Sequence, residues 1–591
     1  MSPEAAHADP AAPRGRGAER CVNGVLALSV LAAGYVFVKA LVRAGAGYDF
    51  SDEGYYLNAI AHAGKYSAQV SFFGEIYHPL FRLVGEDVVA FRRAGLILTG
   101  SLTFGVALLL FQRIEMSWRA AAGAGAASVA GLLVNYYWLV TPNYNTLTLQ
   151  GALIVVAGVL MIERWRDAAL GTVGCVAVGV GGWLSAMAKP PAGVTLGLVA
   201  LLLLVGFGVA SIRRFVVIGL SAVLAFLVFA IAIAGSPAAL ISRMVSGSEA
   251  WGVLGYPLSA LLRWDPLPLT TAEKWVLLAN FLLTLAATLM VMSRKAPLVV
   301  VGSVVAGAFL VYVTVAGMPG LPWALSQVFA LQLAAPTLGA MAAIALRRPP
   351  PWRWRESLAA VGFLLMPLAV AFGTDVMLWR NAGHAAFFWV VGTAVLAAGV
   401  GRLSHLVPVL AVSVALTSTV TAHQQHIGYR QTTPTAQQGD PTRIGTTGTV
   451  LMSSDFADYI DGLRKAARRA GFQPGTPMID LTGHYPGAVF ALGAVPAGAP
   501  WLIGGYPGSV GFVKAAMANV PCEQLRAAWL LAEPTGPRAV PMSVLPAGRP
   551  RYEAVGRVQS PTGAYPLSYE QILYRPLPAA RSADACAEHA K

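Results

Sequence analysis

The sequence predicts an all-α polytopic membrane protein that ends in an α/β domain outside the membrane. Of its 591 residues, 56% are hydrophobic and only 12% are charged, and the mean hydropathy is +0.61. Such a composition is too apolar for a soluble multidomain protein, and many apolar runs reach the length needed to cross a bilayer. After residue 423 the composition becomes polar, which indicates a separate domain.

Thirteen apolar runs are candidate transmembrane helices. They cover 22–42, 94–112, 119–140, 146–162, 168–188, 192–210, 215–234, 275–292, 297–317, 325–346, 357–373, 385–400 and 404–421. If the N-terminal tail is cytoplasmic, nearly every inside connection contains Arg or Lys, as the positive-inside rule requires. The net charge of +14 is therefore interpreted as a topology signal and not as nucleic-acid binding.

Four regions follow from this pattern. They are a disordered cytoplasmic tail at 1–21, a transmembrane catalytic module at 22–422 with an external loop at 43–93, a Thr/Gln/Gly-rich linker at 423–450 and an external α/β domain at 451–591. The first apolar run lacks a small-residue cleavage site, so it is expected to be a retained span. An odd number of spans places the C-terminal domain outside.

The C-terminal domain is expected to contain one amphipathic helix and several short strands. The helix covers Asp455 to Ala470, and the apolar runs that follow lie at 478–481, 501–503, 527–531, 552–558 and 571–574. Two Tyr-Pro-Gly sequences, at 485–487 and 506–508, are typical of tight turns, and sugar stacking on their aromatic rings is the alternative.

The cysteines agree with the predicted orientation. Cys21 and Cys175 fall at or within predicted spans, whereas Cys522 and Cys586 fall in the external domain. An oxidising compartment permits disulfides, so we predict a Cys522–Cys586 bond. The sequence has no CxxC or HExxH motif, and a structural zinc site is not expected.

The external loop 43–93 opens with a group of carboxylates directly after the first span. Charges beside hydrocarbon are costly, so Asp52 and Glu53 are expected to line an aqueous site. Adjacent residues point in different directions, which allows Asp52 to act as a general base while Glu53 organises the site. Tyr55 is a candidate for stacking on a sugar ring. The alternative is that the two carboxylates only cap a helix.

Further along the same loop lie Glu75, His78 and Arg92, which we select as substrate-binding candidates. Arg92 stands at the outer end of the second span, against the positive-inside trend, so an anion should compensate it. A lipid-linked phosphate is one candidate. An ion pair with Glu86 or Asp87 is the other.

Two polar sites interrupt the outer ends of later spans. Asn143 lies in Thr141-Pro-Asn-Tyr-Asn145, and Lys189 precedes two prolines. A lysine at a membrane exit can extend to the interface, but beside a proline pair that opens the backbone it can also bind an anion. Both residues are therefore included among the substrate-binding candidates.

These residues resemble a family pattern over roughly the first 210 residues. Asp52-Glu53 in the first external loop, His78-Pro79, Gly85 through Arg92 and Lys189-Pro190 occur in the order seen in GT-C glycosyltransferases that use polyprenyl-phosphate sugars. The chain resembles in particular the bacterial group that includes aminoarabinose transferases and protein O-mannosyltransferases. Where many members have an acidic residue after the third span, this chain has Asn143-Tyr144-Asn145.

The resemblance implies an inverting glycosyltransferase in a bacterial inner membrane. Its donor would be a polyprenyl-phosphate sugar, its partners would include membrane lipids, and its acceptor would be a glycan, a lipid or a protein on the periplasmic side. Asp52 would be the base, Glu53 and Glu75 would shape the site, and Arg92 and Lys189 would stabilise the leaving phosphate. No cofactor is expected, although weak dependence on a divalent metal stays open. A transporter or flippase of lipid-linked saccharides and a glycan polymerase or ligase are the alternatives.

Overall fold

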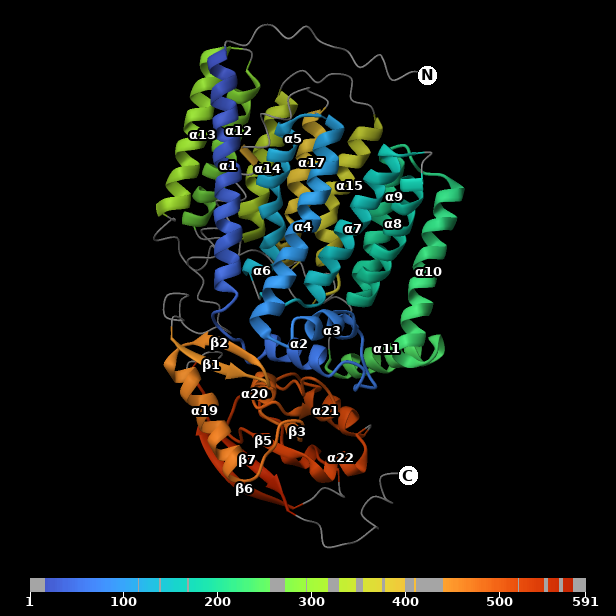
Figure 1. The fold of residues 1–591 in the computed structure, drawn as a ribbon, viewed down its shortest axis with the longest axis vertical. Helices are drawn as coiled ribbons and strands as arrows, with labels where there is room; N and C mark the ends of the chain where they lie inside the picture. Colours follow the sequence, from blue (N-terminus) through green and yellow to red (C-terminus); the bar gives the residue numbers. More distant parts are fainter. Residues whose placement is uncertain are drawn as a thin grey trace.

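The fold is a bundle of long helices with an α/β domain at one end (Figure 1). The computed structural model describes residues 16–114, 116–137, 140–166, 169–255, 271–293, 295–316, 329–346, 354–374, 378–398, 409–410, 439–518, 520–546, 551–562 and 567–577. The predicted fold class, a polytopic helical membrane protein with a C-terminal α/β domain, is confirmed. The predicted span at 404–421 and Cys586 lie outside the described residues, apart from 409–410.

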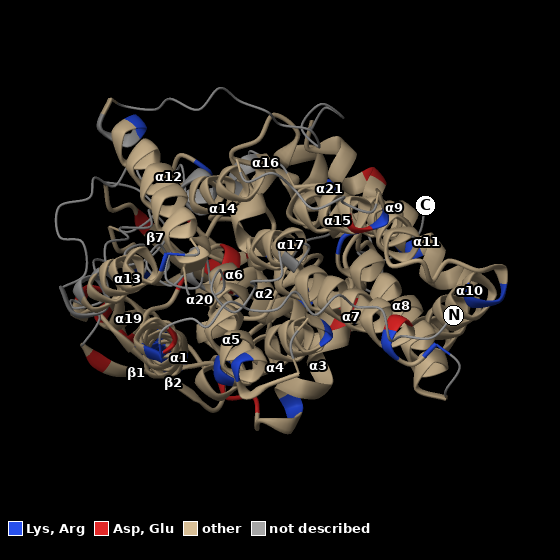
Figure 2. Ribbon diagram, turned by 90° about the horizontal axis from the view of Figure 1, so that it is seen from above, with Lys and Arg blue, Asp and Glu red and all other residues tan. Residues whose placement is uncertain are grey.

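Seven described helices are long and apolar enough to cross a membrane. The apolar segments are Arg16–Arg43 (α1), Val88–Ile114 (α4), Tyr144–Arg164 (α7), Ala169–Ala188 (α8), Ile212–Ala234 (α10), Lys274–Met292 in α12 (Thr271–Met292) and Trp354–Ala371 (α15). Further apolar helices run beside them, namely α9 (Pro190–Gly206), α13 (Ala296–Ala316), α14 (Phe329–Leu346) and α17 (Phe387–Ala398). Figure 2, seen from the end where α1 begins, shows Lys and Arg mainly at helix ends.

The predicted run 119–140 is one apolar stretch, but the structure divides it. It forms α5 (Trp118–Ser128), the 3-10 turn η2 (Val129–Leu132) and α6 (Leu133–Tyr137). Gly131 allows the turn to approach α4, because a Cβ there would lie 2.1 Å from Thr103 Cγ2. Two further short elements, α16 (Leu378–Ala382) and η5 (Gly383–Ala385), precede α17.

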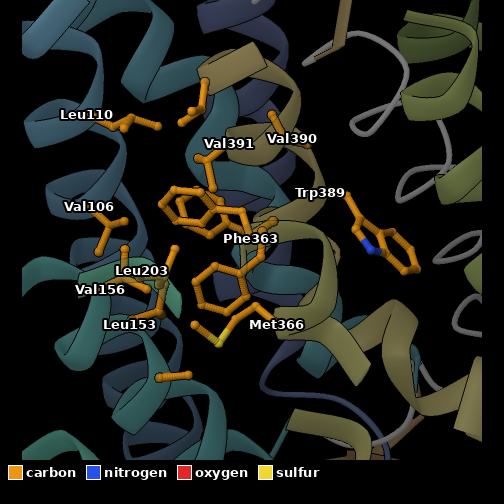
Figure 3. Packing of buried hydrophobic residues seen from close by; sticks show 14 of the residues in the cluster. Val106, Leu110, Leu153, Val156, Leu203, Phe363, Met366, Trp389, Val390 and Val391 are labelled. Atoms are coloured by element: carbon orange, nitrogen blue, oxygen red, sulfur yellow. The ribbon is translucent and has the colours of Figure 1, made fainter. Parts of the chain in front are cut away.

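The bundle core is filled by aliphatic and aromatic side chains from helices far apart in sequence (Figure 3). Phe363 of α15 is fully buried, and Leu203 of α9 and Val391 of α17 belong to the same cluster. Gly362 lets α15 lie against Leu203, since a Cβ at that position would be 2.7 Å from Leu203 Cδ2. Close packing of this kind, and not apolar burial alone, holds helices together in lipid.

Three short helices lie at the end of the bundle that faces the α/β domain (Figure 1). The external loop forms α2 (Asp52–Ala61) and α3 (Phe73–Leu83), and α11 (Pro237–Val253) follows α10. Helices of 10, 11 and 17 residues are too short to span the hydrocarbon layer. They form a layer between the spans and the domain, as expected for the loop 43–93.

The α/β domain has a hairpin and a mixed five-stranded sheet. The hairpin joins β1 (Asp440–Ile444) to β2 (Gly448–Met452), and the sheet order is β4-β3-β5-β7-β6. Its strands are β3 (Pro477–Asp480), β4 (Val495–Pro496), β5 (Trp529–Ala532), β6 (Tyr552–Gln559) and β7 (Glu570–Pro576). Strands β3, β4 and β5 are parallel, whereas β7 pairs antiparallel with both β5 and β6.

Alternating side chains divide the buried residues of the sheet between two cores. Met478, Trp529 and Leu531 share a cluster with α19 (Ser454–Arg469), whereas Ile479 and Leu530 pack with α21 (Ser509–Ala518) and α22 (Cys522–Ala527). The first cluster continues into the external loop. The domain and the loop therefore share one hydrophobic core.

Some boundaries differ from the sequence-based expectation. Helix α1 already begins at Arg16, inside the predicted tail, and residues 440–450 of the predicted linker form the hairpin. The hairpin forms because Thr442, Ile444, Val450 and Met452 alternate inward. The run 501–503 is not a strand, and the Gly504 that follows packs against the carbonyl oxygen of Arg538, where no side chain would fit.

Two carboxylates are buried where the parallel strands β3 and β5 end. Asp480 accepts hydrogen bonds from the Thr482 backbone (2.9 Å) and side chain, and Glu533 accepts one from Gln571 Nε2 (2.7 Å). The second oxygen of each carboxylate is buried without a hydrogen-bond partner. Burial raises the pKa of Asp480 to about 6 and that of Glu533 to about 7.

These raised pKa values predict how the stability of the domain depends on pH. Both carboxyl groups are ordinarily ionised above about pH 4 in the unfolded chain. The native state therefore binds protons more tightly, so the stabilisation is fully present below about pH 4 and is lost as the pH rises through 6 to 7.

Glu533→Gln should raise the unfolding temperature at pH 8 and flatten its decline between pH 5 and pH 8. Thermal unfolding of the purified full chain in detergent measures both effects. The matched control is Glu553→Gln, because Glu553 is exposed in its 2.7 Å pair with Arg575 and should change little. An unchanged pH profile in Glu533→Gln would contradict the assignment.

Candidate active site

The acidic stretch after α1 folds as a cap on the first turn of α2. Asp49 Oδ1 accepts from the Ser51 backbone (3.1 Å) and from the Ser51 hydroxyl (2.9 Å), and Asp49 Oδ2 accepts from the Glu53 backbone (3.3 Å). Burial, and after it the charge of Glu53, raises the pKa of Asp49 to about 6, while hydrogen bonds from Ser51 lower it. Asp49 therefore supports the backbone that carries Asp52 and Glu53.

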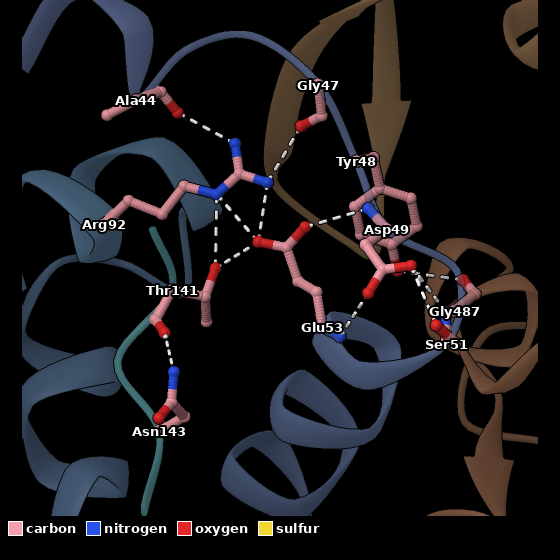
Figure 4. Close-up of polar contacts among 10 residues, drawn as sticks. All are labelled: Ala44, Gly47, Tyr48, Asp49, Ser51, Glu53, Arg92, Thr141, Asn143 and Gly487. Carbon is pink, nitrogen blue, oxygen red and sulfur yellow. Dashed lines mark hydrogen bonds and ion pairs between the residues drawn. The ribbon is translucent and has the colours of Figure 1, made fainter. Parts of the chain in front are cut away.

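Glu53 and Arg92 form a buried ion pair (Figure 4). Arg92 Nη2 lies 2.6 Å from Glu53 Oε1, and the two side chains are 3% and 2% exposed. The remaining guanidinium hydrogen bonds go to the carbonyl oxygens of Ala44 (2.8 Å) and Gly47 (2.9 Å) and to the Thr141 hydroxyl (3.2 Å). Thr141 also donates to Glu53 Oε1.

This geometry shows what neutralises Arg92. All three guanidinium nitrogens are bound by protein oxygens, and the carboxylate is Glu53 and neither Glu86 nor Asp87. Glu86 pairs with Arg82 at 3.5 Å, and Asp87 accepts from the Ala90 backbone at the start of α4. The Arg92 pair ties together the segment after α1, the first turn of α2, α4 and the loop before α7.

Asp52 is the half-buried carboxylate of the same turn, and it lies beside tyrosines. Burial raises the pKa of Tyr56, and the nearby Tyr144 and Asp52 raise it further. The rings of Tyr56 and Tyr144 lie 5.7 Å apart, edge to face, and Tyr144 begins α7. Asp52 therefore lies near the end of α7 that adjoins α2.

Lys189 is buried on the same side of the bundle, between α8 and α9. Its Nζ donates to Asn145 Oδ1 (3.1 Å) and to the Val370 carbonyl oxygen (2.8 Å). Within the part of the chain that the structure describes, no carboxylate lies in ion-pairing range of Nζ. The helix is interrupted here because Pro190 and Pro191 cannot continue α8 and instead open α9.

Two other predicted site residues have local structural contacts. Asn143 caps α7, because its Oδ1 accepts from the Asn145 backbone (2.9 Å) and the Thr146 backbone (3.2 Å). His78, on α3, has its Nδ1 2.7 Å from the Ile60 carbonyl oxygen, which links α3 to α2. The structure thus brings Asp52 and Lys189 to one region through Tyr144 and Asn145, whereas Asn143 and His78 hold helices in place.

Glu75 is buried on α3 and is paired with an arginine of α11. Arg243 Nη2 lies 3.3 Å from Glu75 Oε1, 2.6 Å from Gln69 Oε1 and 2.8 Å from the Tyr66 carbonyl oxygen. Tyr55 is near both Glu75 and Asp52, since burial and then the charges of Tyr144, Glu75 and Asp52 raise the pKa of Tyr55.

The α/β domain packs against α2 and the residues just before it through direct backbone contacts. The Gly487 backbone N–H donates to the Phe50 carbonyl oxygen (2.7 Å), and the Tyr48 hydroxyl donates to the Gly487 carbonyl oxygen (3.0 Å). A Cβ at Gly54 would lie 2.1 Å from Gly487 N. Asn58, one turn later, donates to the Pro486 carbonyl oxygen (2.8 Å). Both glycines are required by this close approach.

Sequence reasoning did not identify Tyr144 or Gly487 as functional residues. Tyr144 lies in the Asn143-Tyr-Asn145 stretch, of which only Asn143 was selected. Gly487 ends a Tyr-Pro-Gly sequence that was interpreted as a turn. Pro486 in fact opens helix α20 (Pro486–Ala491), and Gly508 of the second such sequence packs on Val253 of α11. Both sequences mediate contacts with the helical layer.

The cysteines and metal-ligating residues give a partial answer to two predictions. Cys522 is disulfide-bonded, whereas Cys21 and Cys175 are free. Among the described residues, no group of three or more His, Cys, Asp or Glu side chains is arranged to hold a metal ion. Dependence on a divalent metal stays untested.

The fold and the site define a polytopic helical membrane protein in which an α/β domain closes onto an acidic external loop. Its structure is similar to the crystal structure of ArnT from Cupriavidus metallidurans in the apo state, with 17% identity, a TM-score of 0.42, and coverage of 93% of this chain and 97% of that chain. ArnT is an aminoarabinose transferase, the kind of protein that the loop motifs resemble. No family model and no curated protein sequence matches the chain.

Removing one partner of the buried ion pair should destabilise the protein strongly. Arg92→Met leaves Glu53 buried without its cation, which should cost about 3–5 kcal/mol of unfolding free energy. The double variant Glu53→Gln with Arg92→Met should recover part of the loss, because no lone charge remains. Arg93→Met is the control, since Arg93 is exposed and donates to a single backbone carbonyl. Equal effects at positions 92 and 93 would refute this account.

Gly487→Ala should separate the α/β domain from α2. The added Cβ would lie 2.7 Å from Phe50 Cα, and relief of that contact should cost about 1–3 kcal/mol. Gly462→Ala in α19 is the matched control, because the nearest atom to its Cβ is 3.6 Å away and alanine favours a helix. Thermal unfolding of both variants tests the difference. The close contact between Gly487 and Phe50 predicts a loss of stability only for Gly487→Ala.

Proposed function

We propose that this protein is an inverting glycosyltransferase that moves one sugar from a polyprenyl-phosphate carrier to an acceptor outside the membrane. The observation that carries the proposal is the 3.1 Å contact between the buried Lys189 ammonium and Asn145. Asn145 adjoins Tyr144, whose ring lies 5.7 Å from that of Tyr56 on α2, the helix that begins at Asp52. A base and an uncompensated cation thus share one polar region at the outer end of the spans.

The proposed reaction uses these two charges at opposite stages of one displacement. Asp52 accepts the proton of the acceptor hydroxyl, and that oxygen forms a bond to the anomeric carbon of the sugar. The bond from that carbon to the phosphate oxygen breaks, and its electron pair leaves with the polyprenyl phosphate. Lys189 stabilises the negative charge that grows on the leaving phosphate.

Lys189 is suited to an anion because its protein partners are neutral. An ammonium group buried at a membrane boundary is costly unless something compensates its charge. The amide of Asn145 and the carbonyl of Val370 satisfy two of its three hydrogens but carry no net charge. A phosphate at the lipid headgroup level would supply the missing negative charge. Arg92, which is already bound by Glu53, is proposed to position the acidic loop.

The distribution of basic residues supports a cytoplasmic end opposite this site. Arg113 and Arg164 end α4 and α7, and Arg119 and Arg214 lie near the beginning of α5 and α10, on the far side of the bundle from α2. By the positive-inside rule, that end faces the cytoplasm of a bacterial inner membrane. The α/β domain would then be periplasmic, and the acceptor would be a glycan, a lipid or a protein on that side.

Asp52→Asn should lower sugar transfer by about 100-fold or more, because the amide cannot take the acceptor proton. The assay uses purified protein, a radiolabelled polyprenyl-phosphate sugar and an envelope extract from the source cells as acceptor. Asp87→Asn on the same loop is the control, since asparagine preserves its cap on α4 and activity should stay at the wild-type level. Full activity of a folded Asp52→Asn protein would rule out the assigned base. Movement of the intact donor across proteoliposomes without transfer would favour a transporter.

A further inference from the structure

A second polar group lies beside the Asp52 region and plays no part in the displacement step. It comprises Tyr66 of the segment after α2, Glu75 of α3 and Arg243 of α11. Three of its polar atoms, the Tyr66 hydroxyl, Glu75 Oε2 and Arg243 Nε, are buried without a hydrogen-bond partner. Tyr66 and Glu75 are each 3% exposed. Buried polar groups are nearly always hydrogen-bonded, so three such atoms in one group call for a partner from outside the chain, a water or a ligand.

The three atoms belong to one place in the fold. The Arg243–Glu75 pair measures 3.3 Å, and the same Nη2 of Arg243 contacts the Tyr66 carbonyl oxygen at 2.8 Å. The Tyr66 phenol is close to Glu75, because burial and then the charge of Glu75 raise its pKa. Backbone contacts fix the arrangement. The Gln69 backbone N–H donates to the Arg243 carbonyl oxygen (3.2 Å), and Gly247 lies against Gln69, where a Cβ would be 2.4 Å from the Gln69 carbonyl carbon.

The combination of donors and acceptors defines the chemistry of the ligand. Glu75 Oε2 needs a donor, Arg243 Nε needs an acceptor, and the Tyr66 hydroxyl can serve in either role. A phosphate would be repelled by Glu75, and a cation would be repelled by Arg243. A sugar hydroxyl donates one hydrogen bond while accepting others, so adjacent hydroxyls of one ring match the set.

Tyr55 connects this group with the Asp52 region. It is near Asp52 and Tyr144, and it is also near Glu75 and Tyr66. Its ring lies 5.8 Å from that of Phe73 and 6.1 Å from that of Trp501 in the α/β domain. Aromatic surfaces of this kind are suited to contact a sugar ring.

We propose that Glu75, Arg243 and Tyr66 form the specificity site that binds hydroxyl groups of the transferred sugar. The inference rests on the proposed function, because it takes the sugar of a polyprenyl-phosphate donor as the ligand. Phosphate binding by Lys189 and hydroxyl binding by this site are separate contributions to donor affinity. Each can be removed without the other.

The test measures binding to the full chain in lipid nanodiscs, so that no acceptor is needed. The probes are a polyprenyl-phosphate hexose, its single-deoxy analogues and polyprenyl phosphate without a sugar. Glu75→Gln should weaken binding of the complete donor by roughly 10- to 100-fold and leave binding of the bare polyprenyl phosphate unchanged. Tyr66→Phe, which removes only the hydroxyl, should give a smaller loss with the same selectivity.

The deoxy donors and the protein variants together form a double-mutant cycle, in which one change is made in the substrate and the other in the protein. The analogue that lacks the recognised hydroxyl should bind wild type and Glu75→Gln with equal weakness, because the same hydrogen bond is removed twice. Glu86→Gln is the matched control, since Glu86 is the carboxylate of an exposed Arg–Glu pair in the same external loop. It should change binding of no probe.

The outcomes separate the two levels of the proposal. Equal weakening of the complete donor and the bare lipid by Glu75→Gln, or additive losses in the deoxy cycle, would show a structural role and overturn the specificity site alone. The specificity site would also be overturned if wild type bound the bare lipid as tightly as the complete donor. The sugar would then contribute nothing to binding, and a buried water could make the hydrogen bonds of these atoms. Failure of wild type to bind any polyprenyl phosphate would overturn the proposed function and this site with it.

Discussion

The arrangement of the external side depends on the buried pair between Glu53 and Arg92. It joins the chain after the first span to the first turn of α2, to α4 and to the loop before α7. A buried pair stabilises less than its Coulomb energy suggests, because both charges lose water. Its geometry is nonetheless specific, since five hydrogen bonds fix one orientation of the guanidinium. The pair thereby holds the first turn of α2, to which Asp52 belongs.

The buried charged residues near α2 fall into two groups, which differ in whether the protein itself supplies their partners. Glu53 with Arg92 is neutral as a pair, and all three guanidinium nitrogens are hydrogen-bonded to protein oxygens, so the charge of Arg92 is compensated within the protein. Lys189 lacks a counter-ion among the described residues, and Glu75 with Arg243 leaves buried polar atoms without partners. The first group explains how the loop is held. The second group is where we propose that the substrate binds.

The sequence was sufficient to predict the class of fold and the carboxylates of the loop, but not the partners of each charge. Hydropathy locates spans because the bilayer dictates their length, and the alternation of Met478 to Leu481 follows from a two-faced sheet. The pairing of Arg92 with Glu53 spans 39 residues and requires the loop to fold back on α4. The close approach of Gly54 and Gly487 joins residues more than 400 positions apart. No local pattern reports such contacts.

The core shared by the external loop and the α/β domain has a consequence for biogenesis. Phe50 follows the first span, yet its ring packs against Phe456, Tyr459 and Tyr485, which are synthesised after all the described spans. The carboxylate loop therefore lacks these packing partners until the C-terminal domain has been synthesised. A polypeptide arrested or cleaved before that point would carry Asp52 but lack the surface that shapes the loop. Completion of synthesis itself thus acts as the step that assembles the site.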